Sequence, residues 1–338
     1  MAQPGMDTNP ERIFQIMNGF QYSAAFKTAV DLELFTKIAE GNKTSADIST
    51  ACRASERGIR IIADTLTVVG LLNKHQGEYS LTDASAAFLD KHSPAYMGSA
   101  VEFMMSPVQM NGFENLTQAV RQGGSTVTDG GSIDPESPMW VTFARAMAPM
   151  LMPAAQMLPG HIGFESDRKL KVLDIAAGHG MFGIMVAKAF PHAEIYALDW
   201  KNVLTVANES AQKFGVADRH HLIPGSAFDT DLGDGYDVVL VTNFLHHFDV
   251  ETCTNFMRKV NGSLNEGGKA ITLEFVPNDD RVSPPSEALF SLIMLAATPA
   301  GDAYTFAELK DMCEKAGFSQ NEHTPLAPTP HHLIVSMK

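Results

Sequence analysis

Apolar residues recur at helical spacing along the first hundred positions of the chain. Between positions 10 and 38 they stand three or four residues apart, at Ile13, Phe14, Ile16, Met17 and Phe20. This spacing is typical of one face of a helix. Polar start signals at Thr44 and at Ser55 predict two more helices, and the second of these reaches Gly70, which suits a helix end. We therefore expect about three short helices before position 71.

Two short strands are predicted after these helices. They cover positions 71–74 and 78–82 and flank the turn at Gly77, so they should form a hairpin. Three helices and a hairpin make a winged-helix pattern, which often binds DNA. Here the predicted second helix carries acidic as well as basic residues, and the formal net charge of the chain is -14. Because nucleic-acid binding depends on Lys and Arg that displace counterions, we expect no nucleic-acid partner.

From about position 95 to 165 the chain is rich in methionine, and a glycine-rich stretch from 123 to 131 interrupts this segment. Methionine fills gaps in cores and also lines adaptable binding surfaces. Most of these methionines are expected to lie on helices that pack in a core. A few can form a wall of a substrate pocket, since ligand sites tend to form between domains.

Strands and helices alternate in the remainder of the chain. Strands are expected at 171–176, 194–199, 236–241, 269–275, 318–323 and 332–337, with helices between most of them. Repeated strand-helix units predict a parallel sheet. The last two strands have no helix between them, so one strand near the edge should be antiparallel. The expected fold class is α/β, a doubly wound Rossmann-like sheet preceded by a mainly helical region.

Composition narrows the class of protein further. Apolar residues make up 45% and charged residues 19% of 338 positions, a balance typical of a folded chain long enough for two domains. Three widely separated cysteines and the paired histidines lack ligand spacing, so neither a disulfide framework nor a metal site is expected. No signal peptide and no stretch of ~20 apolar residues is visible. We expect a cytoplasmic protein with no membrane partner.

A glycine loop marks the first strand of the alternating region. Gly178, Gly180 and Gly183 fit the pattern GxGxxG between a predicted strand and helix, which allows a tight turn and close approach of a ligand. Asp199, at the end of the next strand, can accept hydrogen bonds from the two hydroxyls of a ribose. These features fit NAD and S-adenosylmethionine equally.

Three details favour S-adenosylmethionine. Asp174 lies in the strand before the glycines, where a carboxylate suits a cationic amino-acid ligand and would repel a pyrophosphate. The loop lies mid-chain behind a helical region, whereas a dinucleotide fold often begins its chain. The sheet is also expected to close with an antiparallel pair. For Asp174 itself, an alternative is that it only accepts a hydrogen bond from nearby backbone.

Several segments resemble, in order, the motifs of class I O-methyltransferases. They are 172–180, Asp199, 225–228, 243–248 and 265–269. The set resembles the plant caffeate and flavonoid type and its bacterial small-molecule relatives, whose dimerisation domain the winged-helix start also resembles. The resemblance implies S-adenosyl-L-methionine as cofactor and a homodimer. It divides the chain into a dimerisation domain (1–100), a helical linker that contributes to the substrate pocket (101–165) and a catalytic domain (166–338).

The resemblance also implies catalytic roles. His246 matches the family's general base, a role that suits an imidazole near neutral pH. Glu274 matches one of the acidic residues that orient this base. At the second acidic position the chain has Ala303, with Asp302 one residue before it. Either Asp302 takes this role, or His246 relies on Glu274 alone.

Two further groups complete the predicted site. Ser226 stands where the plant type has Asp, so we expect a hydroxyl and apolar packing around the adenine, and Trp200 can lie against the adenine or pack in the core. The expected cofactor-binding residues are Asp174, Ala176, Gly178, Gly180, Asp199, Trp200, Ser226, Ala227, Phe228 and Asn243. The candidates for lining the acceptor pocket are Phe143, Met147, Met150 and Met294.

The function that the sequence favours is methyl transfer to a hydroxyl of a small, largely apolar molecule. A phenol is the expected acceptor. Since its pKa near 10 leaves it mostly protonated at neutral pH, a positioned base helps to remove its proton. Three alternatives stay open: a relative that binds S-adenosylmethionine but catalyses a non-methylating reaction, a DNA-binding regulator that senses the cofactor, and an NAD-dependent dehydrogenase.

Overall fold

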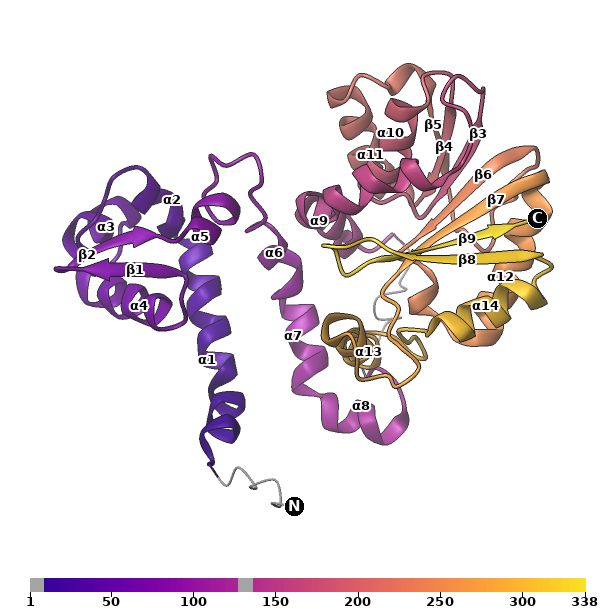
Figure 1. Ribbon diagram of the computed structural model, residues 1–338. Helices are drawn as coiled ribbons and strands as arrows, with labels where there is room; N and C mark the ends of the chain where they lie inside the picture. Colours follow the sequence, from indigo (N-terminus) through magenta and orange to yellow (C-terminus); the bar gives the residue numbers. More distant parts are fainter. Residues whose placement is uncertain (1–8, 127–135) are drawn as a thin grey trace, which may run out of the picture. The chain divides into compact units, whose positions relative to one another are not determined.

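The computed structural model describes residues 9–126 and 136–338. Residues 1–8 of the expected first domain and residues 127–131 of the glycine-rich stretch lie outside the described residues. The chain divides after Val101 into two compact units (Figure 1). The methionine-rich segment after Val101 falls within the same unit as the sheet.

The N-terminal unit contains helices and one hairpin. Its elements are α1 (Glu11–Asp31), α2 (Leu34–Ala39), α3 (Ser45–Cys52), α4 (Glu56–Val68), β1 (Leu72–His75), β2 (Glu78–Leu81) and α5 (Asp83–Phe88), and α6 (Ala100–Met104) begins at its end. The apolar pattern over 10–38 forms two helices because Glu33 takes a left-handed conformation, with a φ of 53°. Thr44 caps α3 through a capping box with Asp47, as the polar start signal predicted.

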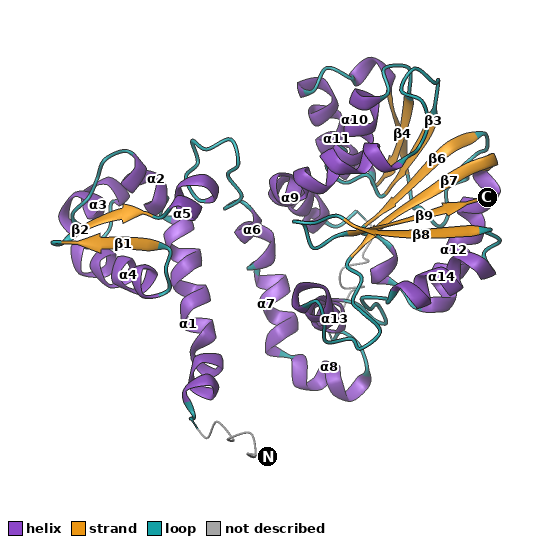
Figure 2. Ribbon diagram, in the orientation of Figure 1, coloured by secondary structure: helices purple, strands orange, loops and turns teal. Residues whose placement is uncertain are grey.

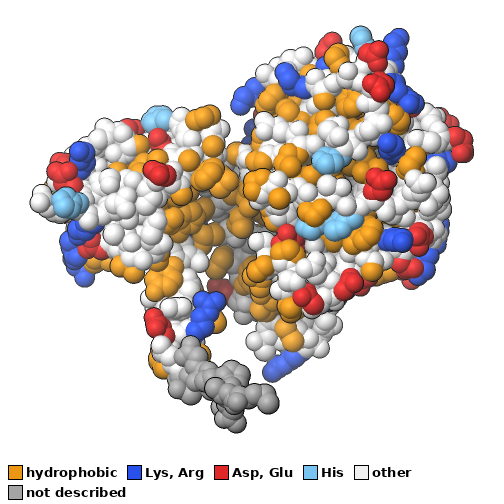
Figure 3. All heavy atoms as spheres, in the orientation of Figure 1, with side chains coloured by type: hydrophobic (Ala, Val, Ile, Leu, Met, Phe, Trp, Pro, Cys, Tyr) orange, Lys and Arg blue, Asp and Glu red, His pale blue; other side chains and the backbone are white. Residues whose placement is uncertain are grey.

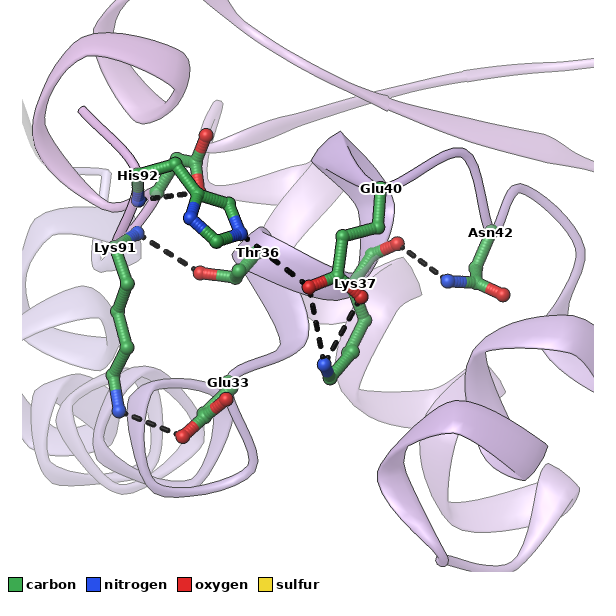
Figure 4. A network of polar contacts seen from close by, with 8 residues as sticks. Glu33, Thr36, Lys37, Glu40, Asn42, Lys91 and His92 are labelled. Atoms are coloured by element: carbon green, nitrogen blue, oxygen red, sulfur yellow. Dashed lines mark hydrogen bonds and ion pairs between the residues drawn. The ribbon is translucent and has the colours of Figure 1, made fainter.

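A polar network joins the segment after α5 to α2 (Figure 4). The backbone N–H of Lys91 donates to the hydroxyl of Thr36 at 2.9 Å, and the Lys91 ammonium donates to Glu33 at 2.7 Å. Thr36 is buried, and its hydroxyl is satisfied by this backbone donor. The network therefore holds the segment after α5 against α2 within the N-terminal unit.

The C-terminal unit is built on a seven-stranded sheet (Figure 2). Its strands are β3 (Lys171–Ile175), β4 (Glu194–Asp199), β5 (His220–Pro224), β6 (Tyr236–Thr242), β7 (Leu264–Glu274), β8 (Gln320–Pro325) and β9 (His332–Met337). They lie in the order β5-β4-β3-β6-β7-β9-β8. β9 is antiparallel to both of its neighbours, while the pairs from β5 to β7 are parallel. The predicted doubly wound sheet with one antiparallel strand is confirmed.

Helices cover both faces of this sheet. The helices of the C-terminal unit are α7 (Pro107–Glu114), α8 (Leu116–Gln122), α9 (Pro138–Met157), α10 (Met181–Ala189), α11 (Lys201–Lys213), α12 (Val250–Ser263), α13 (Pro285–Ala297) and α14 (Phe306–Lys315), with short 3-10 turns η2 (Leu158–His161), η3 (Ala217–Arg219) and η4 (Leu245–His247). Of these, α7 and α8 contact α13. One apolar core joins the sheet to α12 and α14, and a second joins it to α9, α10 and α11. Among the described residues, no helix is long and apolar enough to cross a bilayer.

The edge strand β5 is the one element of the sheet that the hydrophobic pattern did not predict. Only His220 of its five residues is buried, and Leu222 is 40% exposed. An edge strand has one neighbour and one covered face, so it needs no apolar run. Its neighbour β4 supplies the pairing, from Ile195 opposite His220 to Asp199 opposite Pro224.

Close packing between α10 and the sheet depends on Gly183. A Cβ at this position would lie 2.7 Å from the Ile195 side chain and 2.8 Å from a carboxylate oxygen of Asp174. The third glycine of the GxGxxG pattern therefore lets the helix approach the strands.

We expect Gly183→Ala to lower the free energy of unfolding by about 1–3 kcal/mol, because the added methyl group overpacks a rigid contact. Gly262→Ala is the matched control: it is also helical, but its Cβ would meet no atom within 4 Å. This control should be neutral or more stable by up to about 1 kcal/mol. Urea unfolding followed by far-UV circular dichroism measures both, and equal stability of the two variants would contradict the packing argument.

Candidate active site

The glycine loop between β3 and α10 exposes its backbone. Ala176, Gly178 and Gly180 have φ angles of 50°, 57° and 75°, in the left-handed region that glycine adopts without strain. A Cβ on Gly178 would meet only the carbonyl oxygen of Ala176, at 3.8 Å. At Gly178 the turn is therefore free of side chains, and a ligand can approach the backbone there, whereas Gly180 packs on Ala207 of α11.

Asp199 lies at the end of β4 beside this loop. Its carboxylate accepts hydrogen bonds from the N–H of Gly178 at 2.7 Å and from the N–H of Trp200 at 2.6 Å. Burial raises its pKa to about 6, while the two backbone donors act in the opposite direction. Each carboxylate oxygen has a further lone pair, so Asp199 can accept from the hydroxyls of a ribose while it holds the loop.

Asp174 lies behind the loop, fully buried in β3. One of its oxygens accepts from the N–H of Gly183 at 3.0 Å, and the other has no partner among the described residues. Burial raises its pKa to about 8, and the nearby Asp199 raises it too. The structure thus gives Asp174 the backbone contact that the sequence left as an alternative. A direct contact with the cofactor stays a prediction.

His179 also stabilises the loop. Its Nδ1 accepts from the N–H of Met181 at 3.0 Å, so it caps the start of α10. Burial lowers its pKa to about 4, which keeps the ring neutral and able to accept this hydrogen bond at pH 7. The ring has a structural role here.

The turn after β5 carries the expected adenine contacts. The Ser226 hydroxyl accepts from the N–H of Phe228 at 3.1 Å, and its own proton can still be donated to a ligand. Ala227 is buried and Phe228 is partly exposed. Lys259 of α12 holds this turn, because its ammonium donates to the carbonyl oxygens of Ala227, Phe228 and Thr230 at 2.6–3.0 Å. Sequence reasoning missed Lys259, since no local motif marks it.

These groups fit S-adenosylmethionine. The open side of Gly178 admits a ligand to the backbone, and the carboxylate of Asp199 suits a ribose. Ala227 and Phe228 offer an apolar surface for an adenine. Trp200 packs in a small cluster with residues of α9 and α11, so the structure favours the core alternative for its ring.

The loop after β6 holds the predicted base. Asn243 adopts a left-handed conformation, with a φ of 52°, and donates its N–H to the carbonyl oxygen of Leu273 at 2.8 Å. One oxygen of Glu274 accepts from the N–H groups of Phe244 and Leu245 at 3.0 and 2.8 Å. The other oxygen contacts Nδ1 of His246. The structure thus brings Glu274 and His246 together, both buried, at the carboxyl ends of neighbouring strands.

The side chain of Asn243 lies beside this pair. Its Oδ1 is buried and has no partner among the described residues. A buried acceptor without a donor is rare in folded proteins. The predicted contact of Asn243 with the cofactor would supply such a donor, and it stays a prediction.

Asp302 is directed elsewhere. Its carboxylate accepts from the Arg281 guanidinium at 3.1 Å and from the N–H of Ala303 at 2.8 Å, so the structure does not bring it to His246. Gly301, one residue earlier, packs on the loop itself: a Cβ there would lie 2.1 Å from the carbonyl oxygen of His246. Of the two possibilities for the second acidic position, the geometry favours Glu274 acting alone.

Aromatic rings surround the two histidines of the loop. On one side, Trp140 of α9 lies edge-on to His247, with ring centroids 5.7 Å apart, and Phe143 follows Trp140 at 5.7 Å. On the other side, Phe290 of α13 lies edge-on to His246 at 4.8 Å and stacks on Phe275 at 4.0 Å. We call these four aromatic residues the ring wall.

Of the four predicted pocket residues, only Phe143 belongs to the ring wall. Met147 packs against the core between α9 and the sheet. Met150 is 36% exposed, whereas Met294 is buried on α13. Trp140, Phe275 and Phe290 were missed. Their signal, an aromatic residue on each of three segments far apart in the sequence, becomes visible only when the fold brings the segments together.

His247 makes different contacts from His246. Its Nδ1 contacts the carbonyl oxygen of Phe244 at 3.3 Å. Burial, and then the nearby His246, hold the pKa of His247 well below its usual range. The ring is neutral at pH 7 and its Nδ1 is engaged with the backbone, which supports the expectation that it is not a second base. Within the described ranges, no group of three or more His, Cys, Asp or Glu residues could hold a metal ion.

Comparison with known proteins identifies the family. The O-methyltransferase domain model matches residues 162–319, and the O-methyltransferase dimerisation domain model matches residues 14–91. A curated relative, the 3-hydroxy-5-methyl-1-naphthoate 3-O-methyltransferase of Streptomyces sahachiroi, is 25% identical over 94% of this chain and 92% of its own.

Two solved structures share the fold over the whole chain. A Nostoc punctiforme protein assigned as an O-methyltransferase is 47% identical, with a TM-score of 0.93 and complete coverage of both chains. Human N-acetylserotonin methyltransferase in complex with S-adenosylmethionine is 20% identical, with a TM-score of 0.84, and matches 100% of this chain and 99% of its own. The present chain belongs to the S-adenosylmethionine-dependent O-methyltransferases.

Proposed function

We propose that this enzyme methylates a hydroxyl of a small, flat, largely apolar acceptor, with His246 as the general base. The observation that carries the proposal is the buried contact of Glu274 with His246 Nδ1 beside the ring wall. A carboxylate at Nδ1 keeps the proton on that nitrogen, so Nε2 is the nitrogen that takes the proton of the acceptor hydroxyl.

Residues of this loop and of β7 have different roles in the proposed reaction. Glu274 fixes the tautomer and the orientation of His246, and it stabilises the imidazolium that forms when the ring takes a proton. The backbone N–H groups of Phe244 and Leu245 hold the carboxylate in place. When bound, S-adenosylmethionine supplies an electrophilic methyl group on a sulfonium. The chain itself has to align the acceptor oxygen and remove its proton.

The ring wall supports an aromatic acceptor. Trp140 and Phe290 lie in edge-to-face contact with the two histidines, and flat aromatic ligands pack well in offset or edge-to-face contact with such rings. The naphthoate named for the Streptomyces relative is a molecule of this shape. A phenol also needs the base more than a neutral amine does, because it is protonated at neutral pH.

The cofactor contacts follow from the loop geometry. We propose that Asp199 accepts from the ribose hydroxyls, that Ser226 donates to the adenine and that Ala227 and Phe228 pack against it. Ala176 and Gly178 would offer backbone groups to the amino-acid end, whereas the predicted contact of Gly180 is less favoured because its N–H donates to the carbonyl oxygen of Ala177 at 2.7 Å. Asp174 and Trp200 would contribute indirectly. Asp174 would hold α10 in place, and Trp200 would hold α9.

Two alternatives from the sequence are less well supported. The open glycine loop fits a dinucleotide as well, but the family assignment replaces the dehydrogenase hypothesis. The acidic charge of -14 argues against a DNA-binding regulator. A non-methylating relative is distinguished by the release of S-adenosylhomocysteine, which only methyl transfer produces. The cytoplasmic location stays a prediction.

We expect His246→Ala to lower kcat by roughly 10²–10⁴-fold, the usual contribution of a positioned base. Binding of S-adenosylhomocysteine should stay within about threefold of the wild type, because the ring takes no part in the proposed cofactor contacts. Release of S-adenosylhomocysteine with a panel of phenols measures the first quantity, and calorimetry the second. The control is His221→Ala. His221 is an exposed histidine on β5, and its Nε2 contacts Glu194 of β4. Undiminished turnover would remove the base assignment.

Glu274→Gln tests the tautomer argument. If the amide oxygen keeps accepting from Phe244 and Leu245, its NH₂ group faces Nδ1 of His246 and forces the proton onto Nε2. The ring can then no longer accept from the acceptor hydroxyl. We expect a loss of about 10²–10⁴-fold in kcat with an unchanged fold. Circular dichroism checks the fold, and a variant with wild-type kcat would show that orientation by Glu274 is dispensable.

We further propose that the enzyme is a homodimer through α1. The apolar side chains of this helix are largely exposed in the single chain, for example Ile16 at 67% and Phe20 at 68%, and Val68 of α4 is 81% exposed. Figure 3 shows hydrophobic side chains among those at the surface of the N-terminal unit. Ile16 and Val68 also line a groove with Tyr22. Contiguous exposed apolar faces mark interaction sites, and the dimerisation domain model covers residues 14–91. A second copy of the chain is the partner we infer.

We expect the double variant Ile16→Asp, Phe20→Asp to be monomeric, because two buried charges at the interface would cost more than the contact returns. Sedimentation equilibrium should give a mass near 36.6 kDa for the variant and twice that for the wild type. Leu222→Asp, on the exposed edge strand β5, is the control and should stay dimeric. A monomeric wild type, or a dimeric double variant, would contradict the proposal.

A further inference from the structure

His331 is buried without hydrogen bonds on its ring. It is 3% exposed, and neither ring nitrogen has a partner among the described residues. Its backbone is fixed: its carbonyl oxygen accepts from the N–H of Leu326 at 2.9 Å, and its N–H donates to the hydroxyl of Thr329 at 3.3 Å. An imidazole always has a donor or an acceptor to satisfy, so a ring buried in this way calls for an explanation.

The position of His331 connects it to the active site. It directly precedes β9, whose first residue, His332, is paired in register with Glu274. Its ring lies 4.6 Å from the ring of Phe275, which stacks on Phe290, which in turn lies edge-on to His246. Three consecutive ring contacts therefore lead from His331 to the general base along the ring wall.

The charge state of His331 restricts what it can bind. Burial, and then the nearby His246 and His332, lower its pKa to about 4. At pH 7 the ring is neutral, with one N–H donor and one acceptor nitrogen. A neutral imidazole suits a hydroxyl or a carbonyl oxygen better than a carboxylate, which would favour a charged partner.

Other histidines of the same region are already engaged. His332 contacts Glu287 at 3.4 Å and His323 at 2.6 Å. His220 is the closest comparison, because it too is buried with both ring nitrogens unpartnered among the described residues. It lies on β5, however, with four strands between it and β9. His331 is thus the unpartnered histidine that adjoins the ring wall.

We propose that His331 binds a second, uncharged oxygen of the methyl acceptor, a hydroxyl or a carbonyl group on the part of the molecule remote from the methylated hydroxyl. The proposal rests on the proposed function, because it places the acceptor along the ring wall between His246 and His331. It makes His331 a specificity residue, and the preferred acceptor an aromatic molecule with two oxygen substituents.

The test compares two sets of probes on the dimeric enzyme saturated with S-adenosylhomocysteine. The first set is 1-naphthol and 2-naphthol, and the second is the isomeric dihydroxynaphthalenes. Isothermal titration calorimetry gives Kd for each probe with the wild type, His331→Phe, His331→Gln and the control His220→Phe. The phenylalanine variant keeps a ring without a hydrogen-bonding group, and the glutamine variant restores a donor and an acceptor.

We expect at least one dihydroxynaphthalene to bind the wild type roughly 5–10-fold more tightly than the matching naphthol, the range of one added hydrogen bond. His331→Phe should reduce this ratio to less than about twofold while the Kd of the naphthol stays nearly unchanged. His331→Gln should keep part of the ratio, and His220→Phe all of it. If the phenylalanine variant does not fold, His331→Leu gives the same comparison.

Three results would overturn the proposal. They are no gain for any dihydroxynaphthalene with the wild type, an equal loss for both probe sets in the His331 variants, and the same loss in His220→Phe. The base assignment fails independently of these, since it is judged by methylation of the naphthols in His246→Ala. Binding ratios and turnover thus separate a failure of His331 from a failure of the proposed function.

Discussion

The carboxylate of Glu274 is the group on which the geometry of the candidate site depends. It ends β7, and it ties the loop after β6 by two backbone N–H groups and one imidazole nitrogen. A buried carboxylate with this many donors is satisfied, and removing one of its partners would leave an unpaired polar group in the core. The parallel pairing of β6 with β7 sets the distance between the two strand ends. In the proposed mechanism, sheet register and proton transfer are therefore coupled.

Much of the fold could be predicted from local patterns. The glycine loop, the strand ending at Asp199 and the final antiparallel pair each leave a signature in a short window, because glycine, strand periodicity and turn residues act locally. The edge strand β5 could not be predicted in this way, since an exposed strand carries no apolar run. The break between α1 and α2 at Glu33 has no signature either, because a left-handed Glu is set by its surroundings.

The site was less predictable than the fold, for a related reason. His246 and Glu274 were found through their resemblance to a family and lie together in the structure. The role of Asp174 as a backbone partner, the pairing of Asp302 with Arg281 and the ring wall all depend on contacts between distant segments. No spacing rule in one sequence encodes such contacts. Lys259 illustrates the point, because a lysine on a helix is ordinarily a solvated side chain.

The distribution of tryptophan has a practical consequence. The chain has two tryptophans, Trp140 and Trp200. One lies against His247 and the other directly follows Asp199, and both belong to the same small apolar cluster. The N-terminal unit contains neither. Tryptophan fluorescence of this protein is thus confined to the C-terminal unit, beside His247 and Asp199, and it offers an optical signal of ligand occupancy at the proposed site.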